Sequence, residues 1–260
     1  MGAANGAHVS DTEQLVGFYE ETYSRDPAAA LRGARWRALG ARGKAAHVIA
    51  LCARAGLEPA STLEVGCGDG AVLSALHTKR FGGRLAGVEI AQGAVEIARE
   101  RTEIDVVELY DGERLAMPDG AFDLGILSHV LEHVPAPAPL LAEVARVCGA
   151  VVVEVPLEDN LSARRPSSRA HSAEVGHLRR LSRRAVHALV AEAELRVAGE
   201  LEDPLPLEVH RFFARGPLAR ARASVRWGVR AGLHRLAPGV ARRAFTVHYA
   251  CLCLPVEARS

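Results

Sequence analysis

The feature that most constrains the fold of this chain is a short strand followed by a glycine-rich loop and then a helix. Thr62 to Val65 form an apolar strand, Gly66-Cys67-Gly68-Asp69-Gly70 form the loop, and residues 71–79 have helical spacing. Glycines in such a loop let backbone amides approach a ligand at the carboxyl edge of a parallel sheet. The arrangement predicts a nucleotide-type binding site.

Short β-branched runs alternate with helical segments beyond this loop. The expected strands cover residues 62–65, 84–89, 104–109, 122–127 and 151–155, and the expected helices cover 71–79, 92–101 and 138–147. Strands joined by helical crossovers make a mostly parallel sheet with helices on both faces. The predicted fold class is therefore α/β, with a Rossmann-like, doubly wound sheet.

Helical patterns also lie on either side of this core. Residues 11–25 and 28–55 are expected as helices of an N-terminal cap (1–58), ahead of a main domain (59–260). A helix (182–193), a strand (195–201), an amphipathic helix (218–236) and an apolar strand (245–254) should follow. We expect residues 202–243 to form an inserted helical lid, with the apolar stripe of its long helix packed on the core.

The distribution of charge and cysteine limits the class of protein. The net charge is +1, but residues 215–260 hold nine arginines and one acid, for +8, which leaves −7 on residues 1–214. Neither an 18-residue apolar run nor an apolar leader is present, so we expect no membrane span and no secretion. The cysteines show no zinc spacing, and a reducing cytoplasm is the expected location.

A second group of arginines follows the fifth expected strand, opposed by a single acid, Glu174. Such a group would steer an anionic acceptor, and a solvated face is the plainer alternative. RNA is a weaker alternative, because the stretch has no aromatic side chain on which bases could stack. The helix at 218–236 could also lie on a membrane surface. The arginines of this group are Arg164, Arg165, Arg169, Arg179, Arg180, Arg183 and Arg184.

Glu89 narrows the choice of ligand. It ends the second expected strand 19 residues after Gly70, where a carboxylate can accept both ribose hydroxyls of an adenosine. Gly66, Gly68 and Ala71 also satisfy the dinucleotide fingerprint, so these residues alone leave NAD and S-adenosylmethionine open.

Later motifs separate the two cofactors. The motifs are Glu64–Gly70, Gly87–Glu89, Asp111–Glu113, Pro118–Asp123 and Ser128–Val134. Together they resemble the class I S-adenosylmethionine-dependent methyltransferases, in particular a small bacterial group with the pattern lEvGcGdG … sHvLEHv, over roughly residues 60–200. The resemblance implies a seven-stranded sheet whose last strand, 245–254, lies antiparallel beside the sixth.

The resemblance also implies which residues bind the cofactor. The first four contact its methionine moiety, the next four its ribose and adenine, and the last faces the reacting methyl. They are Glu64, Gly66, Cys67, Gly68, Glu89, Ile90, Asp111, Gly112 and Ser128.

Methyl transfer to a hydroxyl needs alignment of the reacting atoms and removal of a proton. Histidine is the usual base near neutral pH. His129, directly after the fourth strand, is the expected catalytic base, and His177 is the second candidate; His171 and His210 lie in neighbouring segments. A surface or structural role is the alternative for each histidine.

The spacing His129-x-x-Glu132-His133 with a later His177 raises a metal alternative. Some methyltransferases with an E-x-x-E-H motif and a downstream histidine bind a divalent ion, and Glu132, His133 and His177 would match three of its ligands. His129 stands where that motif has its first glutamate. Our prediction assigns no metal and leaves this trio open.

The sequence thus predicts a cytoplasmic S-adenosylmethionine-dependent methyltransferase that acts on a small-molecule acceptor, anionic if the arginines border the pocket, at a hydroxyl or carboxylate oxygen. Nitrogen methylation, RNA 2′-O-methylation and a non-catalytic S-adenosylmethionine-binding module are the alternatives. No nucleic acid partner is favoured, and a homodimer stays open.

Overall fold

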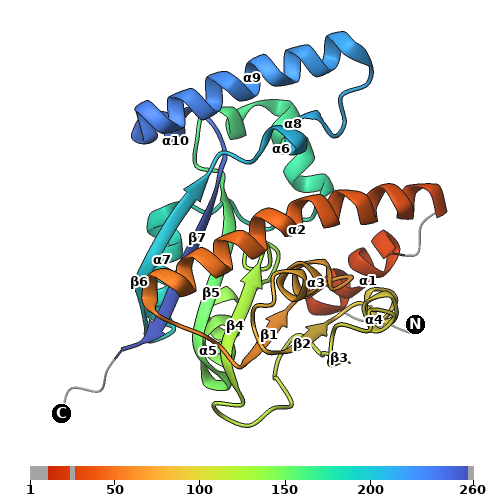
Figure 1. Cartoon of the computed structure of the whole chain (residues 1–260), viewed down its shortest axis with the longest axis vertical. Coiled ribbons are helices and arrows are strands. Elements are labelled where there is room, and N and C mark those ends of the chain that lie inside the picture. The colour runs from red at the N-terminus through yellow and green to blue at the C-terminus, as the bar shows by residue number, and fades with distance from the viewer. Residues whose placement is uncertain (1–10, 24–26, 257–260) are drawn as a thin grey trace, which may run out of the picture.

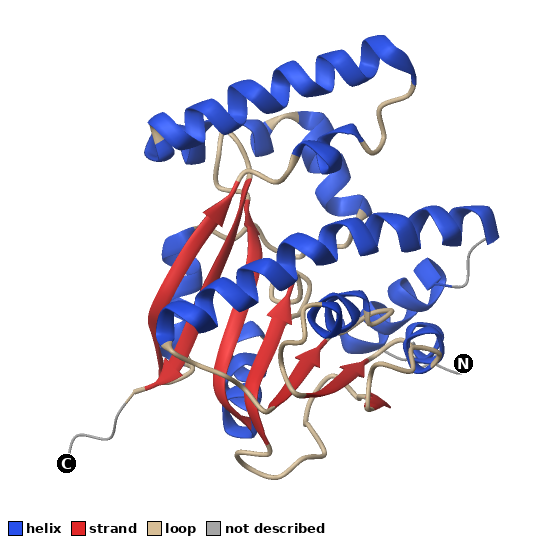
Figure 2. Ribbon diagram, in the orientation of Figure 1, coloured by secondary structure: helices blue, strands red, loops and turns tan. Residues whose placement is uncertain are grey.

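A single seven-stranded sheet with helices on both faces dominates the structure, a computed structural model that describes residues 11–23 and 27–256 (Figures 1 and 2). The strand order is β3-β2-β1-β4-β5-β7-β6. Strand β7 runs antiparallel to both β5 and β6, and the other pairs are parallel. The predicted fold class is confirmed, including the antiparallel last strand. The strands are β1 (Ser61–Val65), β2 (Arg84–Glu89), β3 (Val106–Leu109), β4 (Phe122–Ser128), β5 (Cys148–Leu157), β6 (Leu195–Asp203) and β7 (Val247–Pro255).

The helices follow the expected alternation, with three that were not predicted: α6 (Pro166–Glu174), and α8 (Leu207–Arg211) and α10 (Pro238–Ala244) within the expected insertion. Residues 24 and 25 of the first expected helix, and residues 1–10 of the expected cap, lie outside the described residues. Helix α6 was not predicted, because only Ser172 of it is buried and it therefore has no apolar periodicity. The helices are α1 (Asp11–Tyr23), α2 (Pro27–Ala55), α3 (Ala71–Thr78), α4 (Gln92–Arg99), α5 (Pro137–Val147), α6 (Pro166–Glu174), α7 (Arg183–Glu192), α8 (Leu207–Arg211), α9 (Gly216–Leu236) and α10 (Pro238–Ala244), with a 3₁₀ turn at Ser162–Arg164.

Strand β5 illustrates why the centre of the sheet is buried on both faces. Strand β5 carries a run of valines in which neighbouring side chains point to opposite faces, and nearly all of its residues are buried. Val152 packs in one apolar cluster with α2 and α3, while Val151 and Val153 pack in another with α5 and α7. Helices therefore cover both faces of the strands that support the site.

The parallel strands β1, β2, β4 and β5 end at one edge of the sheet. The order reverses between β1 and β4, and in open α/β sheets ligands bind at the carboxyl edge where this reversal occurs. Helix α2 crosses one face of the sheet, and the segment from α8 to α10 lies beyond the carboxyl edge (Figure 1). These elements surround the edge at which the glycine loop lies.

The expected packing of the inserted segment was partly wrong. A helical insertion does precede β7, but four of the five residues of the predicted apolar stripe of α9 face outward: Leu218, Val225, Val229 and Leu236 are 75%, 68%, 58% and 85% exposed, and the fifth, Leu233, is half-buried. The opposite face packs inward, where α9 contacts α8 and α10 and His234 Nε2 lies 3.8 Å from Oε2 of Glu202 on β6. In the described part of the chain, no helix is both long enough and apolar enough to cross a bilayer.

Candidate functional site

A cavity of about 1540 Å³ opens at the carboxyl edge of the sheet. Its walls come from the ends of β1, β2, β4 and β5, from the start of β7, from α1, α2 and α6, and from the segment that runs from Leu205 into α9. Small-molecule sites usually occupy about 300–1,000 Å³, so this cavity has room for a cofactor and an acceptor together.

The glycine loop needs its glycines for two reasons. Gly66 and Gly68 have φ values of +73° and +55°, in the left-handed region that side chains disfavour. A Cβ atom at Gly66 would lie 2.7 Å from Cγ2 of Val130, and one at Gly68 would lie 2.6 Å from the hydroxyl of Tyr23. The backbone of the loop therefore forms the cavity wall directly.

Glu64 presents an unpartnered buried oxygen to the cavity. Its side chain is 2% exposed and its Oε2 atom has no hydrogen-bond partner. Burial raises the pKa of Glu64 to about 8, although nearby Lys44 acts in the opposite direction. The hydroxyls of Ser128 and Tyr110 also lack partners, and both residues line the cavity. Buried polar atoms normally find partners, so these three are placed to bind a polar ligand.

Glu89 holds the glycine loop from the end of β2. Its Oε2 atom accepts a hydrogen bond from the Gly68 amide at 2.8 Å, and Oε1 accepts from the amides of Ile90 and Ala91 at 2.8 and 3.1 Å. Burial raises its pKa above the ordinary value, and the three amides act against this shift. Glu89 therefore lines the cavity with its carboxylate in a defined orientation.

The other predicted cofactor-binding residues lie at the same edge, with one difference. Gly66, Cys67, Gly68, Ile90, Gly112 and Ser128 line the cavity. Asp111 is exposed and is not among the lining residues; its Oδ1 atom accepts from the amides of Glu113 and Arg114. The observed role of Asp111 is thus to shape the loop that carries Gly112.

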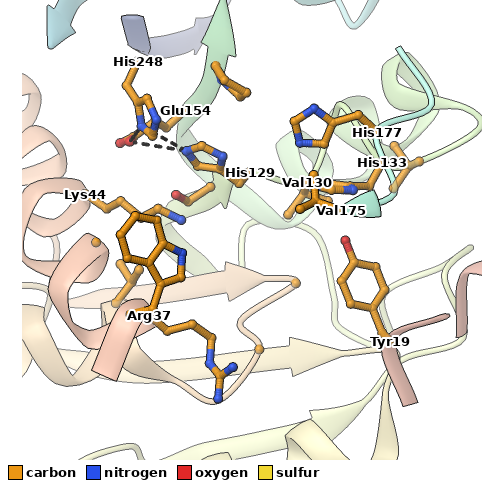
Figure 3. Close-up of a pocket in the computed structure, with 18 of the residues that line it drawn as sticks. Tyr19, Arg37, Lys44, His129, Val130, His133, Glu154, Val175, His177 and His248 are labelled. Carbon is orange, nitrogen blue, oxygen red and sulfur yellow. Dashed lines mark hydrogen bonds and ion pairs between the residues drawn. The ribbon is translucent and has the colours of Figure 1, made fainter. Parts of the chain in front are cut away.

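His129 occupies a strained position at the end of β4. Its φ is +59°, which is rare for a residue other than glycine and is often associated with function. Its Nδ1 atom lies 3.1 Å from Oε1 of Glu132. Its Nε2 atom lies 3.2 Å from Nδ1 of His248, and this Nδ1 atom lies 3.4 Å from Oε1 of Glu154 (Figure 3). Burial and Lys44 lower the pKa of His129, but the two carboxylates outweigh them and raise it.

The network continues from Glu154 to helix α2. Nδ1 of His47 lies 3.0 Å from Oε2 of Glu154, and its Nε2 lies 3.1 Å from Oδ2 of Asp203. Burial opposes the charge on His47, but the two carboxylates raise its pKa to about 9. Burial likewise opposes the charge on Glu154, but its three histidine neighbours hold its pKa well below the ordinary value. Because Nε2 of His129 also lies 3.8 Å from Oε1 of Glu154, carboxylates and imidazoles alternate from Glu132 through His129, Glu154 and His47 to Asp203.

His177 lies in a different part of the cavity, beside His133 (Figure 3). Their rings are 4.8 Å apart, and each Nδ1 is engaged: that of His133 with the Gly176 carbonyl at 3.1 Å, that of His177 with Glu158 Oε2 at 2.9 Å. Burial lowers the pKa of His133 to about 4. One ligand atom from each of Glu132, His133 and His177 lies within 4.8 Å of the others. The trio singled out in the sequence is thus assembled.

Several residues of the site were missed in the sequence. Arg37, Lys44 and His47 line the cavity from α2, where spacings of three and seven residues place them on one face of the helix. Glu154 and His248 were also missed, although a single charged or polar residue within an apolar strand is a usable signal. The predicted helical cap thus provides part of the site.

The arginines after β5 contribute less than expected. Arg165 is the one member of that group that lines the cavity. Arg179 donates to the backbone carbonyls of residues 131, 134 and 135, and Arg183 pairs with Glu200. Of the two further candidate histidines, His171 lines the cavity and His210 does not.

Comparison with known proteins identifies the domain that contains these residues. Residues 63–150 match the family model described as a methyltransferase domain. A ubiquinone biosynthesis O-methyltransferase of Thiobacillus denitrificans is 33% identical over 99 residues, 36% of this chain and 42% of that protein. An uncharacterized 37.1 kDa protein in transposon TN4556 of Streptomyces fradiae is 37% identical over 125 residues, 45% of this chain and 36% of that protein. The chain spans less than half the length of these curated relatives.

Solved structures share the fold over more of the chain. A chain of the Haloferax volcanii complex that contains the Trm112 methyltransferase activator has a TM-score of 0.61 and 18% identity, covering 95% of this chain and 100% of that one. Geranyl diphosphate C-methyltransferase from Streptomyces coelicolor, solved with Mg²⁺, geranyl diphosphate and S-adenosyl-L-homocysteine, has a TM-score of 0.56 and 18% identity, covering 75% and 73%. Residues 63–150 thus match a methyltransferase domain, and the whole sheet has the strand order and fold of these solved structures.

Proposed function

We propose that this chain transfers the methyl group of S-adenosylmethionine to an oxygen atom of a small-molecule acceptor. The observation that carries the proposal is that one cavity joins an unpartnered buried carboxylate at the glycine loop, Glu64, to a histidine held between two carboxylates, His129. The first is suited to an ammonium group and the second to a hydroxyl proton.

The residues around the glycine loop fit the cofactor. When bound, S-adenosylmethionine would supply a methyl group bonded to a sulfonium sulfur. The acceptor atom would bond to this methyl carbon in line with the sulfur, which leaves as a thioether. The unpartnered Oε2 of Glu64 suits the methionine ammonium, and the backbone of Gly66 and Gly68 leaves space beside it. Glu89 and Ile90 both line the cavity at the end of β2; Glu89 would accept the ribose hydroxyls, and Ile90 would cover one face of the adenine.

At the other end of the cavity, His129 would accept the acceptor's proton. Glu132 lies at Nδ1 of His129, so the proton is accepted at Nε2, which exchanges its contact with Nδ1 of His248 for the acceptor hydroxyl. Positioning by buried carboxylates selects one tautomer and orientation of a histidine base. Because the pKa of His129 is raised, its neutral form becomes abundant only above the pH at which an ordinary histidine loses its proton.

Two observations support oxygen as the acceptor atom. A positioned base is needed for a hydroxyl, whereas a neutral amine can react without one. The relatives from Thiobacillus denitrificans and Geobacter sulfurreducens are both named O-methyltransferases.

Arg165 and Arg230 line the acceptor side of the cavity and favour an acceptor that carries negative charge.

A metal-assisted form of the same reaction is the second candidate, favoured by the convergence of Glu132, His133 and His177. Hydrogen bonds at Nδ1 of both histidines orient their Nε2 atoms as ligands. A divalent ion there would polarise an acceptor hydroxyl. Metal content of the purified protein and turnover after chelation separate this candidate from the metal-free reaction: an ion retained at about one per chain and lost in His177→Ala would favour it.

The test is an acceptor screen. The purified protein is incubated with S-adenosylmethionine and a pool of metabolites, and mass spectrometry follows S-adenosylhomocysteine and the methylated product. We expect an O-methylated product, and a loss of roughly 10²-fold or more in turnover for His129→Ala. His171→Ala is the matched control, because His171 lines the same cavity but its side chain is 73% exposed. A product methylated at nitrogen, or full turnover in His129→Ala, contradicts the proposal.

A further inference from the structure

The outward face of α9 is apolar and uncovered. Leu218, Val225, Val229 and Leu236 are all more than half exposed and recur at spacings of seven and four residues, which places them on one stripe of the helix. Gly228 and Gly232 fall on the same side, and a Cβ atom at either would meet nothing within 4 Å. Helix α9 forms the outermost layer of the molecule beyond the carboxyl edge (Figures 1 and 2).

Arginines flank this stripe without acidic partners. Residues 215–243 contain eight arginines and no acid. Within the described part of the chain, the only ion pair that any of them makes is that of Arg242 with Glu202. Helical spacing places Arg222 and Arg226 on one border of the stripe and Arg235 on the other. The face is therefore an apolar strip between two rows of positive charge.

We propose that this face of α9 binds the surface of an anionic lipid bilayer. A helix that lies in a membrane interface buries an apolar face among the acyl chains and uses flanking arginines to contact anionic headgroups. The four exposed aliphatic side chains supply the first part and Arg222, Arg226 and Arg235 supply the second.

The charge distribution disfavours the other occupants of this face. In a symmetric dimer built on it, the same arginine-rich surface would meet itself, with no acid of residues 215–243 to balance it. For a nucleic acid, the centre of the face would have to offer cations or aromatic rings, and it offers aliphatic side chains. A surface that is both anionic and apolar matches both parts of the face.

The opposite side of α9 makes this position relevant to the cavity. Arg230 lines the cavity with its guanidinium 4.8 Å from the centre of the Phe245 ring, and Trp227 donates to the Leu205 carbonyl, which belongs to another lining residue. Docking through the outer face would place one wall of the acceptor cavity beside the bilayer. The inference does not rest on methyl transfer, because binding to vesicles requires no turnover.

The experiment is co-sedimentation of the full chain with vesicles of phosphatidylcholine, alone or with about 30% phosphatidylglycerol. We expect binding to the anionic vesicles that weakens with salt, and at least roughly tenfold weaker binding to the neutral ones. The triple variant Val225→Ser, Val229→Ser, Leu236→Ser and the double variant Arg222→Glu, Arg226→Glu should each lose more than about tenfold in affinity. All five side chains are exposed, and cofactor affinity checks that each variant is folded.

Matched controls change similar residues elsewhere on the surface. Leu31→Ser with Leu178→Ser replaces aliphatic side chains that are 57% and 58% exposed, and Arg32→Glu with Arg42→Glu reverses two exposed arginines of α2. Both controls should bind vesicles as the wild type does. The proposal would be overturned by equal binding to both kinds of vesicle, or by an equal loss of binding in the controls. It would also be overturned, in favour of a second copy of the chain, if no vesicle binding occurred and the protein formed a dimer that only the α9 variants disrupt.

Discussion

Nδ1 of His129 lies 3.1 Å from Oε1 of Glu132, three residues later in the chain. The left-handed backbone of His129, with φ of +59°, ends β4 at this point. Glu132 is only 1% exposed, and burial would raise its pKa, yet His129 holds that pKa at about 2. The two groups therefore stabilise each other's charge inside the cavity, and this coupling can be measured.

Glu132→Gln should shift the pH dependence of kcat/KM to lower pH. In the wild type the rate should rise with an inflection above 6.5, the ordinary histidine value, because the carboxylates raise the pKa of His129. Removing one negative charge lowers that pKa, so the neutral base appears at lower pH. Glu158→Gln is the control, since Glu158 contacts His177 and not His129. An unmoved inflection would show that the rate does not report on His129.

Glu64→Gln should weaken the binding of S-adenosylmethionine and make the unfolding free energy of the ligand-free protein less dependent on pH. Loss of a charge-assisted contact costs about 1–3 kcal/mol of binding, which calorimetry measures. Burial raises the pKa of Glu64 from 4.5 to about 8, so its carboxylate destabilises the folded state increasingly as pH rises from 4.5 to about 8. Urea unfolding across this range should show a smaller fall in stability for the variant. Unchanged cofactor affinity would remove Glu64 from the site.

Gly68→Ala and Gly228→Ala should have opposite effects on stability. The first puts a side chain at φ of +55° and 2.6 Å from the Tyr23 hydroxyl, so it should cost about 1–3 kcal/mol and abolish cofactor binding. The second adds a methyl group to an exposed site within α9, where a Cβ meets nothing, and should stabilise by about 0.5–1 kcal/mol. Denaturant titration measures both. A tolerated alanine at position 68 would mean that the loop does not contact the ligand.

His47→Gln should destabilise the protein in a pH-dependent way. The pKa of His47 rises from 6.5 to about 9 on folding, so its charge contributes fully to stability below pH 6.5 and the contribution is lost as pH rises through about 9. The difference in unfolding free energy between wild type and variant should therefore shrink over that interval. His171→Gln, at a mostly exposed position, should show no such trend. A difference independent of pH would mean that His47 acts by packing alone.

The sequence alone determined the order of elements and the glycine-loop end of the cavity. The glycine loop, Glu89 and the alternation of strands and helices are local patterns, in which residues a few positions apart share one loop or one strand end. Backbone sterics and the period of side chains in strands and helices act at this short range, so they can be read directly. The parallel core of the sheet and the placement of Gly66 and Gly68 follow from them, whereas the seventh, antiparallel strand and the place of Ile90 were implied by the resemblance to the methyltransferases.

Only the tertiary structure decided which residues complete the acceptor end and which surface is left uncovered. His47, Glu154 and His248 are brought together from α2, β5 and β7, and His47 lies 107 residues from Glu154 in the chain. The period of the apolar stripe of α9 predicts burial, and this prediction was wrong: burial requires a partner, and the sheet ends beneath α8 and α10 before it reaches that face. Periodicity reports that one face of a helix differs from the other; only the packing of distant segments decides what that face contacts.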